Sequence, residues 1–192
     1  KSPFGDFLVK TKLELLKSDF NKFQWPGDWP PHKPLVNIIC FALMENHYHL
    51  VLEEITEGGI TRFMRKIGTG MTNYFNTKYN ESGRLFQGAF KAKRIDTDEY
   101  LSYLTVYIQV KNPFELYLGG IKKAITEFDT AFDWAIKYPY CSLADYMSNR
   151  NSPIVEKSIL TSMFSSPELY RKFAKQCMLS MNIEDKIGNL TF

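Results

Sequence analysis

The sequence has few residues that could stabilise a fold through covalent or metal links. Its three cysteines, Cys40, Cys141 and Cys177, are widely spaced and form no CxxC pair, so neither a disulfide framework nor a zinc site is expected. No apolar run approaches 18 residues and we find no signal peptide, which predicts a cytoplasmic protein that neither spans a membrane nor is secreted. Long low-complexity stretches are also absent, and a hydrophobic fraction of 44% over 192 residues is typical of a folded domain.

Charge is nearly balanced. The formal net charge of +3 is mildly basic and permits nucleic-acid binding without requiring it, so the arrangement of the charges has to decide. Histidine is scarce, with three in the chain, yet His47 and His49 are separated by a single residue within the stretch LMENHYHLVLE.

Hydrophobic periodicity predicts strands and helices that alternate along the chain. An α+β fold is therefore expected, with a sheet and helices packed on it. The expected elements are an amphipathic helix over 6–19, strands over 35–44 and 47–53, a helix from 58 to 79, a strand-like segment over 84–96, a helix over 98–112 that ends before Pro113, and two small helices near the C-terminus.

The paired histidines are the first candidate for chemistry. On a strand, residues i and i+2 point to the same face, so His47 and His49 can both reach one divalent cation through neutral imidazole nitrogens. A cation held in this way can polarise a phosphoryl oxygen and align a phosphodiester for displacement. The alternative is an ordinary pair of hydrogen-bonded histidines in a sheet.

The second candidate is a tyrosine near the end of the helix over 98–112. Tyr103 and Tyr107 lie four residues apart on one helix face, and helical tyrosines are usually core residues. Tyr107, however, is followed by the polar residues Gln109, Lys111 and Asn112. A tyrosine hydroxyl beside a bound cation and a cationic side chain is a suitable nucleophile, because the phenolate is stabilised there.

These blocks together resemble a known family. LMENHYHLVLE, TRFMRKIGTGMTNYFNTKYN, SGRLFQGAFKAKRID, YLSYLTVYIQVKNP and YPYCSLADY follow one another over residues 35–175. In this order they resemble the single-tyrosine HUH transposases, most closely the REP-associated tyrosine transposases of the IS200-like group. The resemblance implies a ferredoxin-like antiparallel sheet with helices packed on it.

The resemblance also implies a mechanism. His47 and His49 match the HUH histidines, which bind Mg²⁺ or Mn²⁺, and Tyr107 matches the tyrosine of a YI-x-x-NP-like block. That tyrosine attacks a phosphodiester in single-stranded DNA and forms a 5′-phosphotyrosine link with a free 3′-hydroxyl. The implied protein is a metal-dependent DNA transposase that cleaves and rejoins hairpin-containing DNA at the nucleoid, as a monomer or a homodimer.

Basic residues supply candidates for binding the DNA backbone, with aromatic residues nearby for stacking unpaired bases. For each charge the alternative is a solvated surface, and for each aromatic an ordinary core position. The basic candidates are Arg62, Arg65, Lys66, Arg84, Lys91, Lys93 and Arg94, and the aromatic ones are Tyr74, Tyr79, Phe86 and Phe90.

The sequence departs from the family in two places. Members commonly place an amide ligand four residues after the tyrosine, where this chain has Lys111, and an ammonium group cannot ligate a metal. On an ideal α-helix Gln109 and Asn112 would point about 200° and about 140° away from Tyr107. Either the helix ends early so that Asn112 turns in as a third ligand, or the histidines bind the metal with water and DNA phosphate. Lys111 would then stabilise the phenolate or the scissile phosphate.

The second departure concerns organisation. The strand of the kind YHVTxR that opens the family's sheet has no counterpart before Asp6, so the catalytic domain, assigned to residues 1–125, is expected to lack it. A helical extension is assigned to residues 126–192. Three other readings stay open: an inactive relative that binds hairpin DNA without cutting it, an unrelated metal-dependent hydrolase, and a replication-type HUH nickase.

Overall fold

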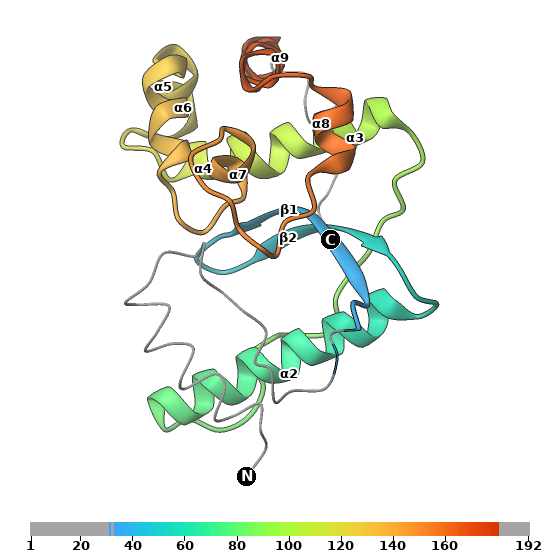
Figure 1. The fold of residues 1–192 in the computed structure, drawn as a ribbon. Helices are drawn as coiled ribbons and strands as arrows, with labels where there is room; N and C mark the ends of the chain where they lie inside the picture. The colour runs from blue at the N-terminus through green and yellow to red at the C-terminus, as the bar shows by residue number, and fades with distance from the viewer. Residues whose placement is uncertain (1–30, 32, 181–192) are drawn as a thin grey trace.

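The structure is built around one β-hairpin with helices on both sides of it (Figure 1). The computed structural model describes residue 31 and residues 33–180, and the predicted helix over 6–19 lies outside this range. In chain order the elements are β1 (Val36–Leu43), β2 (Tyr48–Glu54), α2 (Gly59–Tyr79), α3 (Asp98–Val106), the π-helical turn η2 (Tyr107–Lys111), α4 (Asn112–Glu115), α5 (Gly120–Thr126), α6 (Phe128–Ile136), α7 (Leu143–Tyr146), α8 (Ser158–Met163) and α9 (Pro167–Ser180).

Both predicted strands of the hairpin are confirmed. β1 and β2 pair antiparallel with Ala42 opposite His49 and Leu43 opposite Tyr48. His47 directly precedes β2, and its carbonyl accepts a 2.8 Å hydrogen bond from the Met44 amide, which extends the ladder into the turn. The two histidines therefore lie at the turn end of the hairpin.

The free edge of β1 is covered by the C-terminal half of the chain. Cys141 forms an antiparallel bridge with Ala42, and Val155 forms a parallel bridge with Ile38. Because backbone groups of β1 find partners on both edges, the strand that pairs with His49 is fixed in place from its second side.

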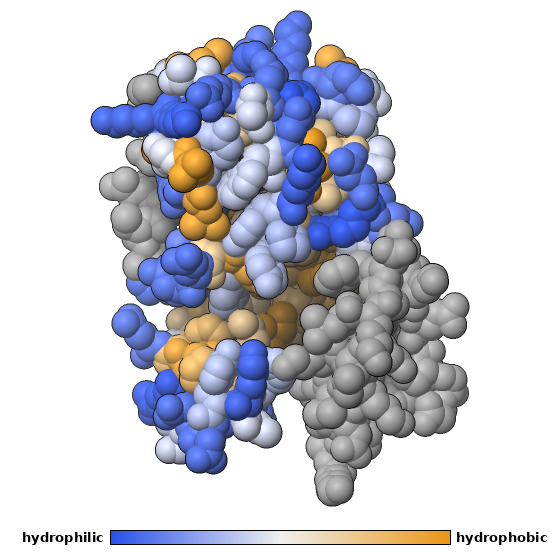
Figure 2. Space-filling model, turned by 90° about the vertical axis from the view of Figure 1, so that its left-hand side faces the viewer, coloured by the Kyte–Doolittle hydropathy of each residue, from blue (hydrophilic) through white to orange (hydrophobic). Residues whose placement is uncertain are grey.

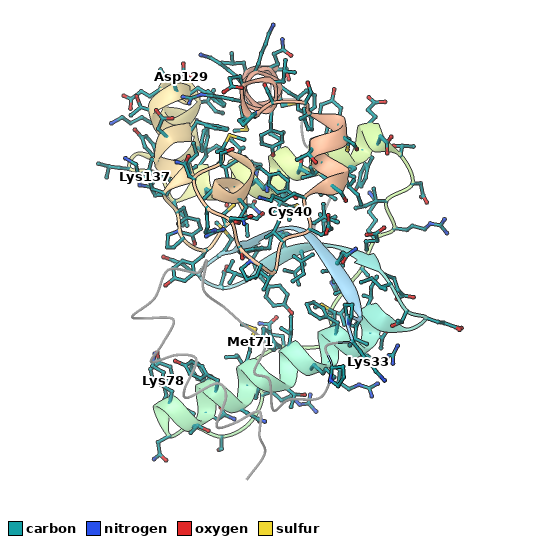
Figure 3. All side chains as sticks on the ribbon, in the orientation of Figure 1. Lys33, Cys40, Met71, Lys78, Asp129 and Lys137 are labelled. Carbon is teal, nitrogen blue, oxygen red and sulfur yellow. The ribbon has the colours of Figure 1, made fainter. Side chains whose placement is uncertain are left out.

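The helices divide between the two faces of the hairpin. α2 lies below the sheet in Figure 1, whereas α3, η2, α4 and the C-terminal helices lie above it. The main core fills the upper side, where Cys40 projects between the sheet and the helices (Figure 3). Its largest fully buried hydrophobic side chains are Ile39, Val106, Val110, Phe114, Phe132, Leu143 and Leu160.

The strand-like segment over 84–96 is a wrong prediction. Residues 82–97 contain no strand and connect α2 to α3 as an irregular segment. Phe86 and Phe90 would share one face of a strand, but Ile95 lies an odd number of residues from both and would point to the other face, so the three could not be buried together. Phe86 instead packs against Tyr48, with ring centroids 5.8 Å apart.

The helix over 98–112 exists but does not end before Pro113. Thr97 caps its start by accepting a 3.1 Å hydrogen bond from the Tyr100 amide. The helix then continues through the π turn η2 and into α4, which contains Pro113. The prediction failed because Cys141 Sγ donates to the Gln109 carbonyl, which replaces the bond that the missing Pro113 amide would have made.

The α+β class and the antiparallel sheet with packed helices are confirmed, as is a helical C-terminal region. α5, α6 and α7 were not foreseen. The division at residue 125 stays a prediction; it falls inside α5. Among the described residues no helix is both long and apolar enough to cross a membrane.

Candidate active site

Two imidazoles meet at the turn end of the hairpin. The rings of His47 and His49 lie edge to face with centroids 5.1 Å apart. His47 is exposed. Its Nδ1 lies 2.7 Å from the Asn46 Oδ1, and its Nε2 takes no part in that contact. The predicted juxtaposition of the two histidines is therefore present.

The Tyr107 ring packs against the second histidine. The centroids of Tyr107 and His49 are 5.6 Å apart and the rings are inclined by 82°. Alternation along β2 explains the contact, because His49 faces the side of η2 while its neighbour Tyr48 faces Phe86 on the other side. The hairpin and the helix thus bring together the Tyr107 phenol and two imidazoles that lie 58 and 60 residues before it in sequence.

The environment keeps His49 neutral at physiological pH. Burial, with smaller contributions from His47 and from the Lys111 ammonium, lowers the pKa of His49 to about 4, while Glu115 acts in the opposite direction. A neutral imidazole has a free lone pair on one nitrogen, which is the form that a metal ion requires.

Lys111 lies directly beside the tyrosine. Its Nζ is 4.9 Å from the centroid of the Tyr107 ring and 2.7 Å from Glu115 Oε1. The lysine side chain is only 14% exposed, so its charge acts on Tyr107 with less screening by water than a surface lysine would.

The π turn changes the position of Asn112. Its backbone amide bonds to the carbonyl of Tyr107, five residues earlier, whereas an α-helix would make this bond to the fourth residue. A π turn takes more residues than the 3.6 of an α-helical turn, so Asn112 lies closer to the Tyr107 face than the α-helical angle of about 140° would place it. The α-helical geometry assumed from the sequence was wrong here.

The π turn accommodates one extra residue. A YI-x-x-NP pattern has two residues between the YI and NP pairs, whereas this chain has three, Gln109 to Lys111. Asn112 itself is 1% exposed, and its Nδ2 is buried without a hydrogen-bond partner. Rotating the amide by half a turn would place Oδ1 at that position, so this side chain could offer an oxygen ligand.

The described residues contain no cluster of three or more His, Cys, Asp or Glu side chains arranged to hold a metal ion. A third protein ligand would have to be of another type, and Asn112 is the candidate that the helix brings to the Tyr107 face. Gln109 is unsuitable because its amide is fully buried and bonded at both ends, to Ser142 and to Tyr170.

The predicted DNA-binding residues lie along α2 and on the irregular segment that follows it. Arg62 lies at the start of α2 and donates to Thr56 Oγ1 at 2.8 Å and to the Glu57 carbonyl at 3.0 Å. This part of α2 is about 25 Å from the helix end that precedes Arg84, given 1.5 Å per residue. Arg62 therefore fixes the loop after β2.

The remaining basic candidates are exposed, and their role in DNA binding stays a prediction. Arg94 pairs with Asp96 at 2.8 Å, and the Lys93 Nζ lies 4.8 Å from the centroid of the Tyr100 ring. Arg65, Lys66, Arg84 and Lys91 are exposed on α2 or on the segment that follows it.

Aromatic and other apolar side chains are exposed along the second half of α2. Tyr74 is 37% and Tyr79 53% exposed, and Phe90 is 39% exposed in the segment beyond. Met71 lies on the side of α2 that faces the sheet (Figure 3). Viewed from the turn end of the hairpin, the molecule is hollowed between α2 and the upper part, with hydrophobic surface inside the hollow (Figure 2). This surface lies on the opposite face of the sheet from Tyr107.

Comparison with known protein families gives a match to the middle of the chain. Residues 32–111 match the family described as Transposase IS200 like, and these residues include both histidines, Tyr107 and Lys111. No curated protein and no solved structure matches the chain. This segment of the chain is therefore similar to the IS200-like transposases.

Proposed function

We propose that this protein is a DNA strand transferase of the REP-associated type, which cleaves and rejoins single-stranded, hairpin-containing DNA through a 5′-phosphotyrosine intermediate. The observation that carries the proposal is the contact between the Tyr107 and His49 rings, with centroids 5.6 Å apart. A tyrosine packed for stability alone would not need two imidazoles and a lysine around it.

In this mechanism His47 and His49 would hold Mg²⁺ or Mn²⁺, with Asn112 as the third ligand, and the bound ion would supply Lewis-acid stabilisation of the scissile phosphate. The Tyr107 oxygen attacks the phosphorus, the bond to the 3′-oxygen breaks, and the proton lost from the phenol is balanced by the proton gained on the released 3′-hydroxyl. Lys111 stabilises the negative charge that develops on the phenolic and phosphoryl oxygens. A second 3′-hydroxyl then reverses the reaction without ATP.

A protein that binds hairpin DNA without cutting it is the second candidate. Lys111 favours it, because this position holds an ammonium that is already paired with Glu115 and cannot ligate a metal.

One experiment separates the candidates. The full chain is incubated with Mn²⁺ and a hairpin oligonucleotide that has a single-stranded 5′ flank, and a denaturing gel is examined for a covalent adduct. The adduct should be lost in Tyr107→Phe and retained in Tyr103→Phe, a matched variant from the same helix whose ring packs on Phe173. His47→Ala and His49→Ala should each abolish it as well.

Binding without an adduct would support the second candidate. Cleavage that survives Tyr107→Phe would identify water as the attacking group and would overturn the strand-transferase proposal in favour of a metal-dependent hydrolase.

A further inference from the structure

The side chain of Gln109, in the middle of the π turn, is held at both ends. It is fully buried. Its Nε2 donates to Ser142 Oγ at 2.8 Å, and its Oε1 accepts a hydrogen bond from the Tyr170 hydroxyl at 2.8 Å. Burial raises the pKa of Tyr170, so the phenol stays protonated and remains a donor. All the contacts come from segments at least 33 residues away in sequence.

Ser142 joins this glutamine to the histidine hairpin. Its Oγ accepts a 2.9 Å hydrogen bond from the Phe41 amide, and its own amide donates to the Phe41 carbonyl at 3.0 Å. Phe41 directly precedes Ala42, the register partner of His49. Although Ser142 occupies the N-cap position of α7, its hydroxyl makes no capping bond there, because it is used for the contacts to Phe41 and Gln109.

The backbone of the π turn is supported from the same segment. Pro113 has no amide hydrogen, so the Gln109 carbonyl lacks the donor that an α-helical residue four positions later would supply. Cys141 Sγ donates to this carbonyl at 3.6 Å. Burial raises the pKa of the Cys141 thiol to about 12, which keeps the hydrogen on sulfur.

π turns are uncommon because their hydrogen-bond geometry is less favourable than that of the α-helix, and they occur mostly as single turns at functional sites. External contacts must therefore select the π register over the α register. We propose that Gln109, clamped between Ser142 and Tyr170, is a positioning residue that holds the π turn and thereby the Tyr107 phenol against His49. This inference rests on the proposed strand-transfer function.

The inference assigns a task to the C-terminal part of the chain. Ser142 and Tyr170 lie outside the segment that matches the transposase family. The nucleophile and the histidines belong to that segment, but the hydrogen bonds that set their relative position come from beyond it. The C-terminal helices are therefore part of the apparatus that aligns the reacting groups.

Tyr170→Phe tests the clamp, because it removes one hydroxyl and little volume. Tyr146→Phe is the matched control: its hydroxyl also makes a structural hydrogen bond, to the Ile39 carbonyl at 2.6 Å, but does not touch the π turn. We expect Tyr170→Phe to lower the single-turnover rate of adduct formation about tenfold with unchanged oligonucleotide affinity, and Tyr146→Phe to leave the rate near that of wild type. The inference would be overturned if both variants formed the adduct at the wild-type rate, or if both lost the same fraction of that rate.

A second measurement remains informative if wild type forms no adduct, a result that would defeat the proposed function by itself. Hydrogen exchange at the Asn112 amide, which bonds to the Tyr107 carbonyl, reports the π turn without DNA. Ser142→Ala should accelerate this exchange at least tenfold more than exchange at the Leu104 amide in α3. Equal acceleration at both sites would show that Ser142 supports only general stability, and the clamp would be refuted.

Discussion

Replacing Asn112 by leucine should stabilise the metal-free protein. The two side chains branch at the same carbon and have nearly the same shape, so the change removes the amide without opening a cavity. Asn112 is 1% exposed and its Nδ2 has no hydrogen-bond partner. This amide is hydrated in the unfolded chain and desolvated in the folded one, so it destabilises the folded wild-type protein.

The magnitude follows from this cost. An unsatisfied buried polar group destabilises a fold by about 1–3 kcal/mol, and leucine exceeds asparagine in helix propensity by a few tenths of a kcal/mol. For a chain of this size each kcal/mol corresponds to about 2–4 °C in melting temperature. Asn112→Leu should therefore melt at least about 2 °C above wild type in the presence of EDTA.

Thermal unfolding with and without Mn²⁺ provides the assay. Mn²⁺ stabilises a protein according to its affinity for the folded state, so the rise in melting temperature on adding Mn²⁺ should be smaller in Asn112→Leu if the amide is a ligand. Gln109→Met is the contrasting variant: it removes a buried amide that is bonded at both ends and should lower the melting temperature. A metal-free Asn112→Leu protein less stable than wild type would show that the amide is satisfied and would refute the reasoning.

Three further changes test other parts of the site. Because the pKa of His49 is lowered, the unfolded chain binds more protons than the folded protein between pH 6.5 and about 4. The free energy of unfolding in EDTA should therefore fall as the pH drops through this window. Melting curves of His49→Gln should show a weaker dependence on pH. Lys111→Met should slow adduct formation by about tenfold or more, whereas Lys172→Met, an exposed change on α9, should not; equal rates would exclude charge stabilisation by Lys111. Arg62→Ala should lower the melting temperature without altering the salt dependence of oligonucleotide binding, whereas Lys91→Glu should reduce its slope by about one, and an unchanged slope would remove that lysine from the DNA interface.

The hairpin and its histidines could be predicted from sequence because their signals are local. Alternation and β-branched residues over 35–53 indicate the strands, and the period of two places His47 and His49 together. The contact between His49 and Tyr107 is not a local signal. It was inferred from the order of the sequence blocks and from a family resemblance, and the structure places the two rings in contact.

The π turn could not be predicted because nothing in residues 107–111 requires it. The helix on either side buries its own face, with Val106 before the turn and Phe114 after it both fully buried. An extra residue in an α-helix would rotate everything that follows by about 100°, which would turn Phe114 away from the core. One wide turn avoids this rotation, but only the tertiary contacts of Gln109 reveal that it forms.

Packing therefore explains the π turn by itself, whether or not the protein cuts DNA. Packing does not explain the Asn112 amide, because an apolar side chain of the same shape would fit the same space and avoid the desolvation cost. A protein that only bound hairpin DNA would have no use for such a group in the turn that follows Tyr107. A metal-dependent strand transferase would use this group, because the free energy lost by burying an unpartnered amide is recovered when that amide ligates a cation. The choice between the two candidate functions thus depends more on Asn112 than on Lys111.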